Sequence, residues 1–428
     1  MFIYIKNTRV IDPATQKDFI GNILIENDRI ADVSTEKIEC EADITIDGSE
    51  MWAMPGFFDM HVHLREPGYE YKETIMSGAN AAVYGGFTGI ACMPNTTPPI
   101  DNASLIHFVY DRAQDAPCKV YPMGSISKGQ MGKELAELGH MAEAGAIAFT
   151  DDGNPVVSGE LMRNAMNYAN MLEKPIISHC EEKSLTRNGV INEGHVSSHF
   201  GFYGIPTIAE ELMVTREVML ARYLKVPVHI AHISTKGSVE IIRHAKADGI
   251  DVTCEVTPHH LVLSEDEFFK RPFDPNLKMN PPLRKEEDRL ALIEGLRDGT
   301  IDAIATDHAP HAIHEKDDDF PLVPFGVIGL ETAVSVIMDR LVNEGHLSPM
   351  RFAEVFSLNP RIILDLPGGI IQKDAPADLT LVSAKKWKVI PDNFFSNSRN
   401  TPFKGWELMG KPIITIVDGE IVFNDTEK

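Results

Sequence analysis

The feature that most restricts the fold of this chain is an alternation, through its middle, of short apolar runs with longer stretches of helical periodicity. The apolar, β-branched runs are 57–63, 88–93, 119–124, 146–151, 175–179, 227–233, 251–256 and 301–307. Candidate helices lie between them at 73–84, 133–144, 160–172, 208–224, 237–247 and 285–297. Eight strand-then-helix units over about 250 residues predict an α/β fold, a (β/α)8 barrel of the TIM type. Near-continuous apolar strands are expected where both faces of a strand are buried.

The two ends of the chain differ from the middle. Residues 2–52 and 375–426 resemble strands and turns, and each end is too small to form a good core alone. We therefore expect one small β-sandwich domain built from both termini, with boundaries at 1–53 and 366–428 around a barrel at 54–365. The alternative is two independent β-extensions.

Charge and cysteine content limit the partners and the compartment. A net charge of -23 argues against a nucleic acid or an anionic membrane as partner, since both require a basic surface. The five cysteines are scattered, which is typical of reduced thiols. The N-terminus matches neither a signal peptide nor a membrane span, so a cytoplasmic protein is expected. An anionic substrate would need a site that supplies its own positive charge.

Metal-ligand residues stand at the ends of five of the eight runs. His61 and His63 end the first run, and side chains at i and i+2 of a strand share a face. The other four endings are Asp151-Asp152, His179, His232 and Asp307. Because chemistry in such barrels lies at the C-terminal ends of the strands, these side chains are predicted to meet.

The four imidazoles and two carboxylates suit zinc or a similar divalent ion. They are too many for one open site, so we expect two ions that share a bridging carboxylate. Two ions can acidify a water molecule and polarise a carbonyl, which is hydrolytic chemistry. Adjacent strand residues point to opposite faces, so only one of Asp151 and Asp152 is expected to bridge, and Gly153 permits the turn that follows.

Longer motifs carry a resemblance to a known family. They are Pro55–His63, His63–Gly68, Met93–Thr96, Phe149–Gly153, Asn280–Arg284, Ala305–His311, Pro376–Leu379 and Thr401–Glu407. Over nearly the whole chain, these segments resemble the amidohydrolase superfamily and, more specifically, its bacterial class I dihydroorotases. The resemblance implies reversible cyclisation of N-carbamoyl-L-aspartate to L-dihydroorotate in pyrimidine synthesis, with two Zn²⁺ per chain.

The resemblance also implies roles for the ligand residues. His61, His63 and Asp307 would hold one zinc, His179 and His232 the second, and Asp152 would bridge the two. Many relatives in the superfamily have a carboxylated lysine as the bridge, whereas this chain has an aspartate before Gly153. Asp307 would also transfer the proton between the attacking water and the leaving nitrogen.

A cationic side chain near the ligands would supply the positive charge that an anionic substrate needs. Arg65 lies two residues beyond His63 and shares its face, and a guanidinium binds a carboxylate through two parallel hydrogen bonds. The alternative for Arg65 is a surface ion pair with Glu66 or Glu70. By resemblance, Asn95 and His311 join Arg65 on the carboxylate, and Asn280 and the backbone of Phe325 and Gly326 bind the ring edge.

Several features stay open in the sequence. Segment 312–324 is either a mobile loop over the site or a plain solvated acidic loop, and His259 and His260 are expected to lie beside the ligands or to be structural. The alternative functions are a hydantoinase or allantoinase, a non-catalytic scaffold for aspartate transcarbamoylase, and a metal-dependent deaminase. A homodimer is expected through apolar helical faces such as 328–341, and an aspartate transcarbamoylase remains a possible partner.

Overall fold

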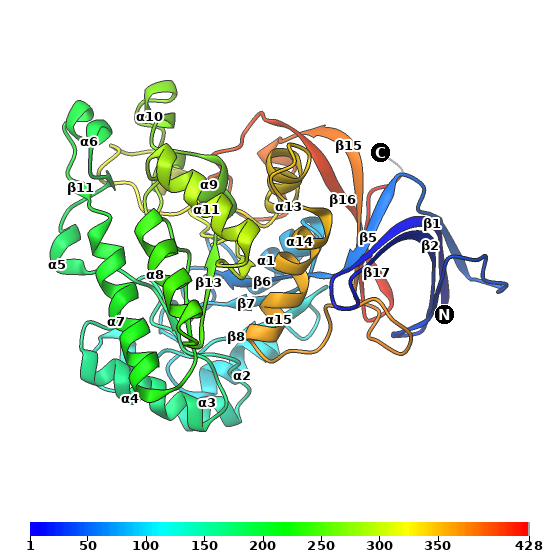
Figure 1. The fold of residues 1–428 in the computed structure, drawn as a ribbon, viewed down its shortest axis with the longest axis horizontal. Helices are drawn as coiled ribbons and strands as arrows, with labels where there is room; N and C mark the ends of the chain where they lie inside the picture. The colour runs from blue at the N-terminus through cyan, green and yellow to red at the C-terminus, as the bar shows by residue number, and fades with distance from the viewer. Residues whose placement is uncertain (427–428) are drawn as a thin grey trace.

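The computed structural model describes residues 1–426 and shows a closed barrel with a sheet beside it (Figure 1). The barrel strands are β6 (Phe57–Val62), β7 (Phe87–Cys92), β8 (Lys119–Pro122), β9 (Ile177–Ser178), β12 (Val228–Ile230), β13 (Val252–Val256) and β14 (Ala303–Ile304). Parallel pairing joins β6 to β7 and β7 to β8, and it joins β9, β12, β13 and β14 in that order.

The run at 146–151 takes the fourth barrel position through isolated bridges. Phe149 bridges Gly124 on one side and Ile176 on the other. A further bridge, between Val62 and the residue after Asp307, closes the ring. The predicted (β/α)8 barrel is therefore confirmed. Its fourth member is shorter than the sequence indicated, because only Phe149 pairs with both neighbours.

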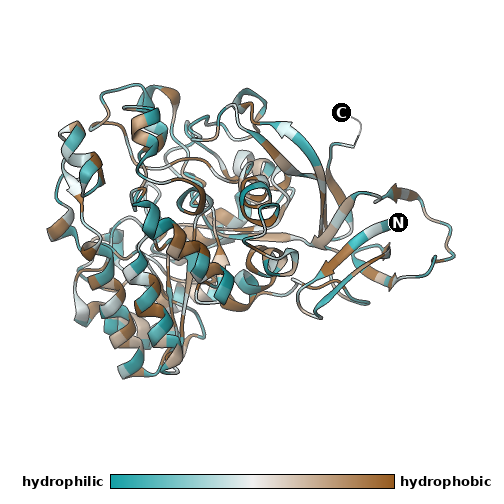
Figure 2. Ribbon diagram, turned by 45° about the horizontal axis from the view of Figure 1, so that its top comes forward, coloured by the Kyte–Doolittle hydropathy of each residue, from teal (hydrophilic) through white to brown (hydrophobic). Residues whose placement is uncertain are grey.

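Helices surround the barrel. The main ones are α1 (Ile75–Tyr84), α2 (Ala103–Arg112), α3 (Leu138–Glu143), α4 (Gly159–Met171), α7 (Ile208–Leu224), α8 (Lys236–Ala247), α11 (Glu286–Asp298), α13 (Ala333–Ile337), α14 (Pro349–Ala353) and α15 (Asn359–Ile363). Side-chain caps start several of them: Thr74 accepts from the backbone N–H of Ser77, and Thr235 from that of Ser238. Hydrophobic and hydrophilic residues alternate along the outer helices, as expected where one side covers the barrel (Figure 2).

Short elements occupy the connections. They are α5 (Lys183–Thr186), α6 (His195–Phe200), α9 (Pro258–Val262), α10 (Glu267–Lys270), α12 (Ile313–Lys316), β10 (Ile191–Asn192) and β11 (Gly204–Ile205). The helix predicted at 133–144 begins only at Leu138, so its first residues were predicted wrongly. The reason is a competing backbone pairing: the N–H of Ala136 donates to the carbonyl of Ile126 at 2.9 Å.

Both ends of the chain enter one eight-stranded sheet, with the order β17-β16-β15-β5-β1-β2-β3 and with β4 paired to β1. Its strands are β1 (Phe2–Asp12), β2 (Lys17–Glu26), β3 (Arg29–Ser34), β4 (Ile44–Asp47), β5 (Met51–Pro55), β15 (Leu379–Lys388), β16 (Glu407–Val417) and β17 (Glu420–Asn424). β5 and β15 pair antiparallel, with Pro55 opposite Leu379. Ile5, Ile23 and Ile414 share its buried core, so the two termini stabilise one another.

The apolar segment 328–341 is not a free surface. Leu330, Val336 and Leu341 are buried, and Ser335 of α13 donates to the carbonyl of Gly410 in β16 at 2.7 Å. This segment is therefore not available for a contact between copies, because β16 of the same chain covers it, and the homodimer itself stays a prediction. Within residues 1–426, no helix has the length and hydropathy needed to span a membrane.

Candidate active site

The six predicted ligand side chains meet at one end of the barrel, and all are buried. His61 belongs to β6 and His63 follows it, while His179 comes directly after β9. His232 and Asp307 stand just beyond β12 and β14. The strands therefore deliver these groups to a single place, as parallel barrel strands do at their carboxyl ends.

Asp152 lies among the four imidazoles. Its Oδ1 is 3.4 Å from His61 Nε2, 3.4 Å from His179 Nδ1 and 3.5 Å from His232 Nε2. Its Oδ2 is 3.5 Å from His63 Nε2. One carboxylate thus faces both pairs of histidines, which is the position that a bridging ligand requires.

Asp151 points elsewhere. Its Oδ1 accepts from the backbone N–H groups of Ile126 at 2.8 Å and Ser127 at 3.1 Å, and its Oδ2 accepts from the Ser127 hydroxyl. These bonds hold the turn after β8. The structure therefore places Asp152, and not Asp151, beside the histidines.

Asp307 completes the cluster. Its Oδ1 lies 3.0 Å from His63 Nε2 and 3.7 Å from His61 Nε2. The ligand atoms of His61, His63 and Asp307 all lie within 4.8 Å of one another, as do those of His61, Asp152 and His232. His179 stands beside the second group, with its Nδ1 2.9 Å from His232 Nε2.

The donor set fits divalent metal ions. Within the described residues, His61 Nε2 and Asp152 Oδ1 are buried and have no hydrogen-bond partner, although they face each other. Buried polar atoms normally have a partner, so two such atoms aimed into one space fit the ligands of a cation. Imidazole nitrogens with carboxylate oxygens are ligands that zinc accepts.

Burial and charge set the protonation of the two carboxylates. Burial alone would raise the pKa of Asp152, but the charge of His61 and the neighbouring imidazoles of His179 and His232 bring it well below its ordinary value. Burial likewise opposes the ionised form of Asp307, yet the His63 hydrogen bond and the charge of His61 lower its pKa to about 2. Both groups are therefore anionic at neutral pH.

Polar residues behind the ligands fix the imidazole rings. Glu255 of β13 has its Oε1 2.6 Å from His61 Nδ1 and its Oε2 3.3 Å from His229 Nε2. Asn95 Oδ1 lies 2.8 Å from His63 Nδ1. Such partners select the tautomer of a metal-binding histidine and orient its ring.

Sequence reasoning missed Glu255. The signal was present: Glu255 is a charged residue inside the apolar run 251–256, and Glu is almost never fully buried unless it is paired. Glu255 stands one residue before the end of β13, so the pattern of ligand types at strand ends does not include it.

Three residues of the site have unusual backbone geometry. Arg65, His232 and Asp307 have φ values of 63°, 28° and 47°, in the left-handed region that non-glycine residues rarely adopt. Each lies where the chain leaves a barrel strand. A conformation of this kind costs on the order of 1–3 kcal/mol and persists only where the surrounding structure enforces it.

A cavity of about 330 Å³ opens beside the cluster. All six residues predicted to bind substrate line it: Arg65, Asn95, Asn280, His311, Phe325 and Gly326. Arg65 is held by a bond from its Nε to the carbonyl of Pro310 at 3.2 Å, and His311 Nε2 lies 2.8 Å from the carbonyl of Phe325. Arg65 is thus a half-buried cation beside the ligands and does not form a surface ion pair with Glu66 or Glu70.

Glu181 also lines the cavity, although sequence reasoning gave it no role. Its Oε2 accepts from Asn280 Nδ2 at 2.9 Å and from Lys183 Nζ at 2.6 Å, and it lies 3.2 Å from His179 Nε2. Glu181 thus joins a metal-ligand histidine to a residue that lines the substrate cavity.

Segment 312–324 is anchored over the region next to this cavity. Lys278 donates to the carbonyls of Phe320 at 3.1 Å and Pro321 at 2.8 Å, and Lys316 donates to that of Pro324 at 2.8 Å. Glu315 pairs with Lys72 at 2.8 Å. Lysine side chains that donate to backbone carbonyls therefore hold the segment in place, and it is not simply a solvated acidic loop.

His259 and His260 remain outside the ligand cluster. His260 Nε2 lies 2.9 Å from the carbonyl of Pro281, and its Nδ1 lies 2.7 Å from the Thr257 hydroxyl. Burial lowers the pKa of His260 to about 4, so this ring is neutral. The first of these contacts joins the segment after β13 to Pro281, and the second lies within the turn after β13.

The barrel, the terminal sheet and the His–Asp cluster together define an amidohydrolase-type protein. The structure is similar to the solved L-hydantoinase (dihydropyrimidinase) from Arthrobacter aurescens, with a TM-score of 0.89 and 25% identity over 99% of this chain and 96% of that one. A D-hydantoinase (dihydropyrimidinase) from Thermus sp. has a TM-score of 0.83 at 23% identity, covering 99% and 95% of the two chains.

Comparison with known sequences identifies the family within this class of proteins. The family described as Dihydro-orotase-like matches residues 51–238. The chain is 49% identical to the dihydroorotase of Syntrophotalea carbinolica and 47% identical to that of Pelotomaculum thermopropionicum, over 99% of each chain in both pairs. This chain belongs to the dihydroorotase family.

Proposed function

We propose that the protein is a zinc-dependent dihydroorotase that interconverts N-carbamoyl-L-aspartate and L-dihydroorotate in pyrimidine (UMP) synthesis in the cytoplasm. The observation that carries this proposal is the position of Asp152 among four histidines, next to a cavity that Arg65 lines. Full-length relatives that carry the name dihydroorotase support it.

His61, His63 and Asp307 would hold one zinc, and His179 and His232 the second, with Asp152 shared between them. Asp152 supports a shared role, because its Oδ1 lies near His179, His232 and His61 and its Oδ2 lies near His63. Two bound ions would supply an acidified water and polarise the carbonyl that it attacks.

Asp307 would move the proton. Its low pKa keeps it ionised at neutral pH, so it can accept a proton from the attacking water. It then returns that proton to the ring nitrogen that leaves, and in synthesis the same steps run in reverse. His63, 3.0 Å away, holds the carboxylate in place.

Arg65 would bind the substrate carboxylate. Its guanidinium remains charged although burial lowers its pKa, because the carboxylates of Asp307 and Asp152 oppose that effect. Asn95 and His311 would join it on the carboxylate. Asn280 and the backbone of Phe325 and Gly326 would bind the ring edge from the other wall of the cavity, which is how a protein of net charge -23 would hold an anion.

The test is a spectrophotometric assay of L-dihydroorotate hydrolysis, with hydantoin and allantoin in parallel and metal content measured on the same sample. Dihydroorotate turnover with about two zinc ions per chain is the expected result. Turnover of hydantoin or allantoin without dihydroorotate would instead identify a hydantoinase or allantoinase. Inactivity on all three substrates in metal-loaded protein would favour the scaffold.

For assembly we propose a homodimer, with an aspartate transcarbamoylase as a possible further partner. Ile208, Leu212 and Met219 of α7 are 46%, 49% and 65% exposed, and they support a contact between copies on this helix. Light scattering after size exclusion, with and without the transcarbamoylase of the same organism, tests both proposals. A monomeric mass at micromolar concentration would exclude the dimer.

A further inference from the structure

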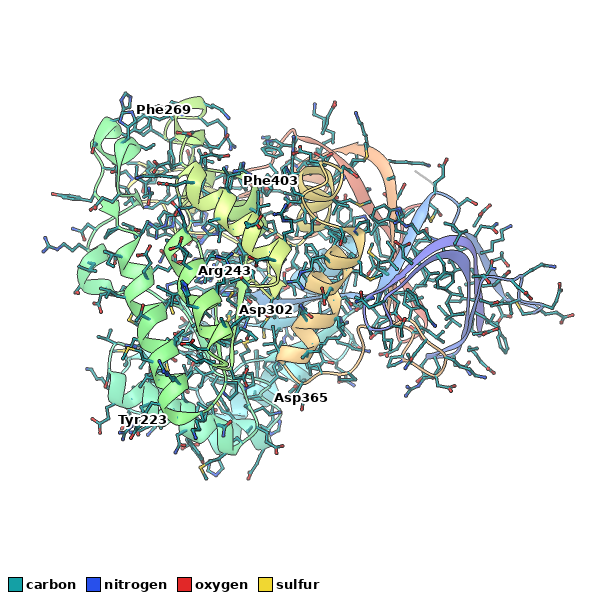
Figure 3. The ribbon with its side chains drawn as sticks, viewed as in Figure 1. Tyr223, Arg243, Phe269, Asp302, Asp365 and Phe403 are labelled. Atoms are coloured by element: carbon teal, nitrogen blue, oxygen red, sulfur yellow. The ribbon has the colours of Figure 1, made fainter. Side chains whose placement is uncertain are left out.

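Segment 394–406 links the 3-10 turn at Pro391–Asn393 to β16 and lies against the loops of the cavity. The backbone carbonyl of Asn400 accepts from the N–H of Ile328 at 3.0 Å. Phe403, labelled in Figure 3, is buried in one cluster with Val327 and Ile328. The C-terminal part of the chain is therefore fixed to the segment that follows Phe325 and Gly326.

The side chain of Asn400 is 5% exposed and uses its amide on two separate loops. Its Oδ1 accepts from the backbone N–H of His311 at 3.2 Å. Its Nδ2 donates to the carbonyl of Ala309 at 3.0 Å and to that of Gly326 at 3.2 Å. Three backbone groups are thus satisfied by one side chain.

The two loops pack closely at this point. Gly326 has a φ of 116°, and a Cβ there would lie 2.6 Å from the Cβ of Ala309. His311 Nε2 also lies 2.8 Å from the carbonyl of Phe325. With this tight fit, a small displacement of either loop moves the other.

We propose that Asn400 is a positioning residue that sets the distance between the two walls of the substrate cavity, a role that rests on the proposed function. Asn400 would not touch the substrate. It fixes the backbone of His311, on the carboxylate side, relative to Gly326, on the ring side. Precise placement of binding groups depends on such supporting bonds.

An aspartate cannot replace this asparagine. A carboxylate keeps the acceptor for the His311 N–H but offers no donor to the carbonyls of Ala309 and Gly326. Three oxygens would then face one another in a buried site, and the loops are expected to separate. The Asp307 carboxylate is held by His63, so the metal cluster is expected to persist.

The experiment compares Asn400→Asp with Asn397→Asp, the same chemical change at an exposed position three residues earlier. KM and kcat for L-dihydroorotate, zinc content and hydrogen exchange of peptides covering 305–330 are measured for each. We expect Asn400→Asp to raise KM by about 10-fold or more, with kcat changed by less than about threefold. Its zinc content stays that of the wild type, and exchange at 309–311 and 326–328 becomes faster.

Several results would overturn this role. An unchanged KM, or a loss in kcat alone, would show that Asn400 does not position the binding walls. Unchanged exchange in peptides 305–330 would do the same, whatever the substrate proves to be. If the wild type fails to turn over L-dihydroorotate, the proposed function fails, while the exchange measurement still decides whether Asn400 fixes the loops. Asn400→Ser, which keeps one donor, replaces the aspartate variant if that one does not fold, and a smaller rise in KM is then expected.

Discussion

Replacing Glu255 by glutamine should weaken metal binding at the site that contains His61. Glu255 accepts from His61 Nδ1 at 2.6 Å, so when a metal replaces the other ring proton, the remaining proton sits on Nδ1 and Nε2 supplies the lone pair that the metal needs. Burial opposes ionisation of Glu255, but His61 and His229 lower its pKa far enough to keep it anionic. Glutamine has the same shape and removes the charge.

The expected loss of metal affinity depends on how completely the pair of His61 and Glu255 is shielded from solvent. Loss of a partner behind a metal-binding histidine costs about 10- to 100-fold in affinity, or about 1.4–2.7 kcal/mol. His61 and Glu255 are both fully buried, so solvent does not screen the loss of the carboxylate charge. The upper end of that range is therefore expected. His63 and His179 have other partners, Asn95 and Glu181, so one of the two proposed metal sites should be affected more than the other.

The assay is competition for zinc against a chelator of known affinity, followed by metal analysis of the bound fraction. Glu265→Gln is the matched control, because Glu265 is also buried and bonded, to Asn192 Nδ2 at 2.6 Å, yet contacts no ligand of the cluster. Zinc affinity within about threefold of the wild type for Glu255→Gln would refute the reasoning. Equal weakening by both variants would also refute it, since the loss would then reflect general destabilisation.

Three further changes test the catalytic group, a buried acid and the core. Asp307→Asn should lower kcat by about 100- to 10,000-fold in zinc-loaded protein, because the amide cannot accept the proton, and a kcat near the wild type in the same assay would exclude that role. Burial raises the pKa of Glu331 to about 8. Between pH 6 and pH 8 the folded protein therefore keeps a proton on Glu331 that the unfolded chain has already released. The free energy of unfolding of the wild type should consequently fall as the pH rises towards 8. Urea unfolding at pH 6 and pH 8 should therefore show the wild type losing about 2 kcal/mol more than Glu331→Gln, and parallel losses would contradict the assignment. Phe57→Ala should cost about 3–5 kcal/mol in the same unfolding experiment, because the ring is fully buried against Phe87, Phe352 and Phe356, and a cost below about 1 kcal/mol would contradict that packing.

Periodicity in the sequence was enough to predict the barrel, since buried parallel strands read as apolar runs. It could not predict which backbone groups pair, so the run at 146–151 was expected to form a full strand although only Phe149 bridges both neighbours. The predicted start of the helix at 133–144 was wrong for a related reason. A hydrogen bond between Ala136 and Ile126 competes with the helix, and residue type does not reveal it.

The candidate site was more predictable at its centre than at its edges. His61, His63 and Asp307 stand at strand ends, and the fold itself brings strand ends together. Asn400 lies far along the chain from the loops that it holds, so no local pattern marks it. The apolar segment 328–341 shows the same limit, because hydrophobicity indicates that a face is covered and does not identify what covers it.

The pairing of β5 with β15 has a consequence for how the enzyme is made. β5 leads through Gly56 directly into β6, the strand that carries His61, yet its partner strand starts at Leu379 and is synthesised late. A nascent chain on the ribosome must therefore hold an unpaired strand edge until nearly all of the protein has emerged, and such edges promote aggregation. Truncated products would lack the strand that secures the entry to β6. Completion of translation and assembly of the metal site are thereby coupled, so prematurely ended chains are expected to be inactive and to be removed.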